Sequence, residues 1–138
     1  MLREYCRKNS ANGNIIYPSI ALMFLFCFLD NLIYVEEGKD GDISWNTEVD
    51  GSNYNVAFNQ LANQTDDLIY AEGILQKNSS KYKYFNTTGL HIQFTLIQVN
   101  KLDVGLYKSM SISNWHHRHN WHAWSSIDGC AFLVMEGM

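Results

Sequence analysis

The stretch that decides the fold is Phe94-Thr-Leu-Ile-Gln-Val-Asn-Lys-Leu-Asp-Val-Gly-Leu-Tyr-Lys-Ser109. Apolar and polar residues alternate up to Leu96, which is typical of a strand with one buried face. Asp103, Gly105 and Tyr107 then follow at every second position. An aspartate can hold a turn through its carboxylate, and a glycine lets the backbone pass close to a neighbouring segment. The stretch therefore predicts a strand, a turn and a second strand.

Short extended segments surround this stretch and are separated by Gly, Asn, Asp and Ser residues. After residue 31, apolar residues nowhere recur at helical spacing over three turns. The clearest alternation places two sets of residues each on one face: Tyr54, Val56 and Phe58, and Leu90, Ile92, Phe94 and Leu96. The expected strands are Leu32–Val35, Asp42–Asn46, Asn53–Gln60, Asp67–Ala71, Lys81–Phe85, Leu90–Leu96, Gly105–Ile112 and Gly129–Met135. Such regular, short strands predict an all-β sandwich or barrel.

The quoted stretch resembles the E strand, the E–F turn and the F strand of variable- and I-type immunoglobulin domains. The pattern of that family is apolar-x-apolar-x-x-apolar-x-x-x-Asp-x-Gly-x-Tyr-x-Cys, in which the tyrosine bonds back to the turn as a tyrosine corner. The matching residues here are Phe94, Leu96, Val99, Asp103, Gly105 and Tyr107. The resemblance covers about Leu32 to Met135 and implies an immunoglobulin-like β-sandwich of about eight antiparallel strands.

The chain departs from this family at the inter-sheet disulfide. The F-strand cysteine of the family falls on Ser109, the B-strand cysteine falls near Trp45, and the C-strand tryptophan falls on Phe58. We expect Trp45 to lie opposite the small Ser109 and to fill the volume that two sulfurs usually occupy. Because such a disulfide is worth roughly 2–4 kcal/mol, packing of aromatic residues has to supply that stability.

Length and composition indicate a single folded domain. The chain has 138 residues, of which 46% are hydrophobic and 17% charged. This composition is that of a globular domain, placed here at residues 31–138. The net charge of -4, with histidines neutral, lacks the basic footprint that nucleic-acid binding requires, so we expect no nucleic-acid partner.

Residues 1–30 have the features of a signal peptide or signal anchor. Three basic residues, Arg3, Arg7 and Lys8, precede the apolar run Ile20–Leu29. Ten apolar residues fit the central region of a secretory signal but are too few to span a bilayer, which needs about 20. Cleavage is expected between Cys27 and Asn31, although no small-x-small site occurs there; otherwise the segment stays as an anchor. Alternatively, the run is a buried core strand or helix.

Three N-x-[ST] sequons, at Asn63, Asn78 and Asn86, support export and predict a secreted or cell-surface glycoprotein. Removal of the leader would leave Cys130 as the one cysteine. An odd cysteine in a secreted chain suggests an intermolecular disulfide, and hence a homodimer, or a free thiol. The alternative is an inert core cysteine.

The segment at residues 114–126 is unusually rich in histidine and tryptophan. By the resemblance it is the F–G loop, a position that often binds partners. We expect Trp115, Arg118, Trp121 and Trp124 to contact a protein or glycan partner, because exposed aromatic residues with arginine match hot-spot composition. Alternatively, His116, His117, His119 and His122 bind zinc or copper, or the tryptophans pack into the sheet.

No motif of a nucleotide-binding, hydrolase or metalloprotease site occurs in the chain, so we do not expect an enzyme. The sequence favours an extracellular recognition or adhesion module, which could also dimerise through a sheet face. The alternatives are a secreted metal-binding protein and the N-terminal fragment of a longer receptor. A membrane association is expected only if the N-terminal segment is uncleaved or the chain is such a fragment.

Overall fold

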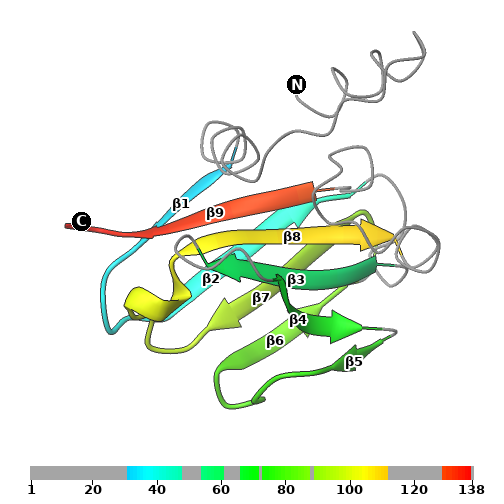
Figure 1. Cartoon of the computed structure of the whole chain (residues 1–138), viewed down its shortest axis with the longest axis horizontal. Helices are drawn as coiled ribbons and strands as arrows, with labels where there is room; N and C mark the ends of the chain where they lie inside the picture. The colour runs from blue at the N-terminus through cyan, green and yellow to red at the C-terminus, as the bar shows by residue number, and fades with distance from the viewer. Residues whose placement is uncertain are drawn as a thin grey trace, which may run out of the picture.

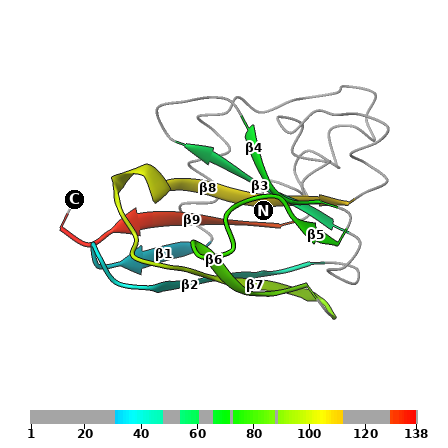
Figure 2. The same cartoon turned by 90° about the horizontal axis from the view of Figure 1, so that it is seen from below.

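The computed structural model describes residues 31–47, 54–60, 66–71, 73–87, 89–111 and 129–137, and they form two β-sheets packed face to face (Figures 1 and 2). The larger sheet has the strand order β1-β9-β8-β3-β4-β5 and the smaller one the order β2-β7-β6. The strands are β1 (Leu32–Val35), β2 (Gly41–Asn46), β3 (Tyr54–Gln60), β4 (Asp66–Ala71), β5 (Ile74–Leu75), β6 (Tyr82–Asn86), β7 (His91–Leu96), β8 (Gly105–Ser111) and β9 (Gly129–Met135). The prediction of an all-β sandwich is confirmed.

The strand pairing is antiparallel except at one edge, where β1 runs parallel to β9. The predicted strands agree with the observed ones to within one residue at each described end. The sequence analysis missed β5 and the 3-10 turn η2 (Lys101–Asp103), because two or three residues are too few to show a period.

Leu90 differs in burial from the residues with which the alternation groups it. Ile92, Phe94 and Leu96 are buried, whereas Leu90 is 59% exposed. The last residue pair between β2 and β7 is Asn46–His91, so Leu90 lies beyond the paired part of the strand. Alternation continues in the sequence past the point where the partner strand stops.

The inner faces of the two sheets meet in an aromatic core. Tyr54, Val56 and Phe58 lie in this core, as predicted. Phe94 from the smaller sheet stacks on Phe85 with ring centroids 4.9 Å apart, and Tyr107 from the larger sheet stacks on Phe58 at 4.6 Å. Each such pair contributes about 0.5–1.5 kcal/mol beyond its buried area, so the aromatic pairs add to the stability of the core.

Trp45 of β2 and Ser109 of β8 meet across the two sheets. The Trp45 Nε1–H donates to Ser109 Oγ over 2.8 Å, and both residues are buried. A Cβ atom on Gly129 would lie 2.4 Å from Trp45 Cδ1, so the indole also requires a glycine at the start of β9. The ring therefore lies opposite Ser109, as expected.

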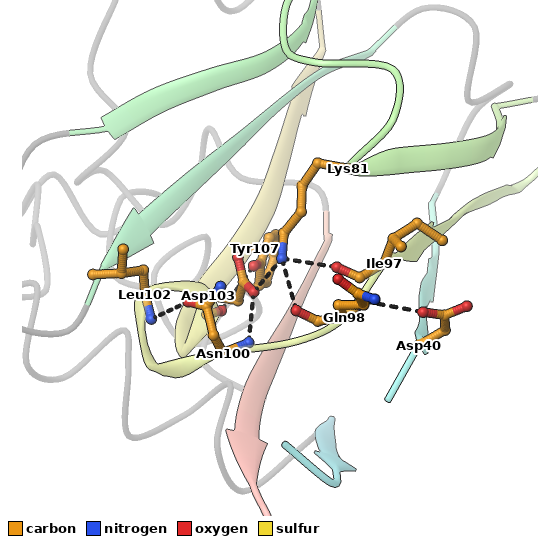
Figure 3. A network of polar contacts seen from close by, with 8 residues as sticks. All are labelled: Asp40, Lys81, Ile97, Gln98, Asn100, Leu102, Asp103 and Tyr107. Carbon is orange, nitrogen blue, oxygen red and sulfur yellow. Dashed lines mark hydrogen bonds and ion pairs between the residues drawn. The ribbon is translucent and has the colours of Figure 1, made fainter. Parts of the chain in front are cut away.

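A polar network fixes the turn between β7 and β8 (Figure 3). The Tyr107 hydroxyl donates to the Asp103 carbonyl oxygen over 2.8 Å. The Asp103 carboxylate accepts from the Asn100 N–H at 2.9 Å and forms an ion pair with Lys81 Nζ at 2.7 Å. Lys81 also donates to the Ile97 and Gln98 carbonyl oxygens, so it ties the start of β6 to this turn. The expectation that Asp103 holds the turn through its carboxylate agrees with this geometry.

Gly105 is required where the chain enters β8. Its φ of 150° lies outside the range that other residues adopt readily, and an added Cβ would lie 2.4 Å from the Asn59 carbonyl oxygen. The close approach of two backbones predicted for this glycine is therefore present.

We expect Ser109→Ala to lower the free energy of unfolding by about 1–3 kcal/mol, because the buried Trp45 Nε1–H loses its acceptor. Thr95→Ala is the matched control, since it removes the exposed hydrogen bond from Thr95 to Asp42 and should cost about 0.5 kcal/mol or less. Urea denaturation of both variants measures the difference. Equal effects would contradict a structural role for the inter-sheet bond.

We also expect stability to fall as the pH rises from about 10 towards 12. Burial, with the charges of Asp103 and Asp67, raises the pKa of Tyr82 to about 12, whereas an unfolded tyrosine titrates near 10. The folded state therefore retains its proton where the unfolded state has lost it, so stability is full below pH 10 and is lost above it. Tyr82→Phe should reduce this loss in thermal melts but not remove it, because burial also raises the pKa of Tyr107. Tyr84→Phe, at a residue that is 78% exposed, should leave the loss unchanged.

Candidate functional site

Three connections leave the sandwich at the same end. Tyr54, which starts β3, pairs with Ser111 at the end of β8, and Gly129, which starts β9, pairs with Ser109. Trp45, near the end of β2, contacts Ser109 as well. The β2–β3 and β8–β9 connections thus start side by side, and the β4–β5 turn follows Tyr70, the partner of Val56 on β3. The strand ends that carry these three connections therefore lie together at one end of the sandwich.

The predicted binding segment, residues 114–126, belongs to the β8–β9 connection and lies outside the described residues. The same holds for the proposed signal segment, residues 1–30. The undescribed site residues are Trp115, His116, His117, Arg118, His119, His122, Trp121, Trp124 and Asn63. Their binding, metal and glycosylation roles stay predictions.

The described part of the chain offers few other sites. It contains no group of three or more His, Cys, Asp or Glu side chains that could hold a metal ion. It also contains no helix of the length and apolar character needed to cross a bilayer.

Two of the three sequon asparagines are described, and both are exposed. Asn78 lies in the turn before β6, where its Oδ1 accepts from the Ser80 N–H at 2.9 Å and from the Ser80 hydroxyl at 2.7 Å. Asn86 ends β6, an edge strand of the smaller sheet. Both positions are therefore accessible to a glycosyl transferase, and their modification stays a prediction.

The outer faces of the two sheets differ in character. On the smaller sheet, Asp42, Asn46 and Gln93 are exposed, as is usual for a solvated face. On the larger sheet the outward-facing residues of the central strands are at most 4% exposed and many are apolar: Asn55, Ala57, Asn59, Leu106, Lys108, Met110 and Phe132. The apolar members are absent from the inter-sheet core, so this outer face is a second buried surface.

A buried ion pair lies on this outer face. Lys108 Nζ is 2.9 Å from Asp66 Oδ1, and the two side chains are 0% and 14% exposed. The Asn59 Nδ2 group donates to the same Asp66 oxygen at 2.9 Å, while Asn59 Oδ1 is buried and has no hydrogen-bond partner. Burial lowers the pKa of Lys108, and the negative charge of Asp66 opposes that shift. The ion pair therefore lies where apolar side chains predominate.

The sequence analysis missed this cluster, although a signal was present. Leu106, Lys108 and Met110 share the face of β8 that a two-layer sandwich would expose, and two of the three are apolar. A solvated face would carry more polar residues, so this set indicates a covered face.

Cys130 lies on the same outer face, next to Lys108 in the residue pairing of β8 and β9. It is disulfide-bonded in this single chain, which differs from the expectation of a free thiol, an inert core cysteine or a bridge to a second chain. Cys130 is the one cysteine among the described residues, so its partner lies elsewhere in the chain.

We expect Asp66→Asn to lower the free energy of unfolding by about 3 kcal/mol, because it removes the negative charge that lies 2.9 Å from the buried Lys108 ammonium. The matched control is Asp67→Asn on the same strand. It breaks the ion pair between Asp67 and Lys77, in which the Asp67 side chain is 60% exposed. Such surface pairs contribute about 1 kcal/mol or less. Similar midpoints for both variants in urea denaturation would show that the outer face is solvated.

Comparison with known proteins assigns neither a family nor a function to this chain. No protein-family model matches the chain, and no curated protein matches it at a significant level. The functional argument therefore rests on the arrangement of the strands, the connections and the buried outer face.

Proposed function

We propose that this chain is an extracellular recognition module built on a variable-type immunoglobulin-like domain. Variable-type sandwiches add two strands, C′ and C″, to the sheet that contains strands G, F and C. In that scheme β9, β8 and β3 correspond to G, F and C, and β4 and β5 correspond to C′ and C″. The smaller sheet then holds strands B, E and D as β2, β7 and β6.

Two contacts support this assignment. The Tyr107 hydroxyl bonds back to the Asp103 carbonyl at the position of the tyrosine corner. Trp45 and Ser109 meet across the sheets at the positions of the two family cysteines, so a hydrogen bond stands where the family has a disulfide. The domain would thus be a divergent member that keeps the corner and replaces the covalent link.

One observation carries the recognition function: the β2–β3, β4–β5 and β8–β9 connections all leave the same end of the sandwich. In variable domains the corresponding B–C, C′–C″ and F–G loops form the antigen-binding surface. The longest of them, residues 112–128, contains Trp115, Trp121, Trp124 and Arg118. Tryptophan and arginine dominate binding hot spots because they combine a large contact area with polar groups. The proposed partner is an extracellular protein or glycan.

An extracellular location fits two further features. The sequon residues Asn78 and Asn86 are exposed, and Cys130 is disulfide-bonded. Disulfides persist in oxidising compartments and are rare in the cytosol. Secretion or display at the cell surface is therefore the setting that we propose for this module.

Fluorescently labelled full chain should bind saturably to intact cells or to a glycan array. Replacement of Trp115, Trp121 and Trp124 by Ser should abolish that binding, because hot-spot tryptophans each contribute about 2 kcal/mol or more. Tyr84→Ser is the matched control, since it removes an aromatic side chain that is 78% exposed and far along the chain from the segment. Binding that survives the triple substitution would move the site elsewhere, and no saturable binding of the unaltered chain would reject the recognition function.

A further inference from the structure

The disulfide of Cys130 has two candidate partners within the chain. The sequence contains three cysteines, and the two others are Cys6 and Cys27. Both precede β1, in the segment that was expected to be a removable signal. We propose that Cys27 is the partner of Cys130, so that the apolar run Ile20–Leu29 is retained and covers the outer face of the larger sheet. This proposal does not depend on the recognition function.

The position of Asn31 brings Cys27 within reach of Cys130. The Asn31 Nδ2 group donates to the Cys130 carbonyl oxygen at 3.1 Å, and the Phe132 N–H donates to the Asn31 carbonyl oxygen at 2.9 Å. Cys27 precedes Asn31 by four residues, which span at most about 14 Å, so the chain can turn back to the Cα separation of a disulfide.

Cys6 is a weaker partner on two counts. It precedes Asn31 by 25 residues, so its effective concentration at Cys130 is about 15-fold lower if it falls as the −3/2 power of chain length. It is also flanked by Arg7 and Lys8, and charged side chains are costly to bring under an apolar cover unless they are paired.

The burial of the outer face supports the apolar run as its cover. Leu106 and Met110 are 0% exposed and Phe132 is 4% exposed, although the described strands form only two layers and the smaller sheet lies against the opposite face (Figure 2). Phe132 neighbours Leu32, the first residue of β1, in the pairing of β1 and β9. The chain before β1 therefore arrives at the edge of the larger sheet, next to Phe132. In the sequence, Cys27 is flanked by Phe26, Phe28 and Leu29.

Formation of the bridge is a two-electron oxidation. The thiols of Cys27 and Cys130 lose two protons and two electrons, and a disulfide such as oxidised glutathione is reduced to two thiols. Any signal-peptidase cut compatible with the bridge lies before Cys27. The mature domain would then begin upstream of residue 27 and not at residue 31.

Tryptic peptide mapping of the full chain, oxidised in a glutathione buffer and alkylated without reduction, tests the pairing directly. Trypsin places the three cysteines on separate peptides, residues 4–7, 9–39 and 119–138. We expect the last two to appear as one linked mass that separates on reduction. A link between peptides 4–7 and 119–138, a dimer of peptide 119–138, or an alkylated Cys130 would each overturn the proposal.

Binding of an apolar fluorescent dye tests the cover. Cys27→Ser should increase dye fluorescence severalfold at an unchanged near-UV circular dichroism spectrum, because it releases the apolar run from Leu106, Met110 and Phe132. The matched control Cys6→Ser should leave both signals as in the unaltered chain. The proposal fails if Cys27→Ser binds no more dye than Cys6→Ser. If replacement of Trp115, Trp121 and Trp124 then increases the dye fluorescence, the cover is the β8–β9 connection. A Cys27→Ser chain that does not fold leaves the peptide map of the unaltered chain as the deciding measurement.

Discussion

The hydrogen bond between Trp45 and Ser109 is the constraint on which the rest of the sandwich depends. It joins β2 of the smaller sheet to β8 of the larger one at 2.8 Å and places an indole between the sheets. The ring sets the spacing at the start of β9, because any side chain at position 129 would collide with it. It also meets Phe94 edge-on at 6.2 Å, and Phe94 in turn contacts the aromatic residues of both sheets.

The hydrogen bond and the aromatic pairs contribute comparable amounts to the contact between the two sheets. A buried hydrogen bond contributes about 1 kcal/mol. The aromatic pairs of the core contribute about 0.5–1.5 kcal/mol each. The turn that contains Asp103 adds a second fixed point, since Lys81, Asn100 and Tyr107 all bond to that residue.

The two outer faces show that this domain is asymmetric. The face of the smaller sheet is polar and exposed, whereas the larger sheet buries apolar side chains and the Lys108–Asp66 pair on its outer side. Burying the Lys108 ammonium group costs free energy unless a negative charge lies beside it. A cover over this face therefore requires Asp66 next to Lys108. With the apolar run as the cover, the segment before β1 would belong to the domain. Because β1 is parallel to β9, that segment reaches the sheet at the end where β9 starts, the same end from which the β8–β9 connection leaves.

The sequence by itself determined the strands and their buried faces, because a period of two residues is a local property of an extended chain. Tyr54, Val56 and Phe58 were assigned correctly on that ground. Part of the turn was predictable as well, because the bonds from Tyr107 and Asn100 to Asp103 join residues at most four positions apart. The exposure of Leu90 was not predictable, because the end of its partner strand is not encoded locally. Only the tertiary structure decided which outer face is covered, that Lys108 meets Asp66, and that Cys130 is bonded, because these facts depend on segments far apart in the sequence that the sheet order brings together.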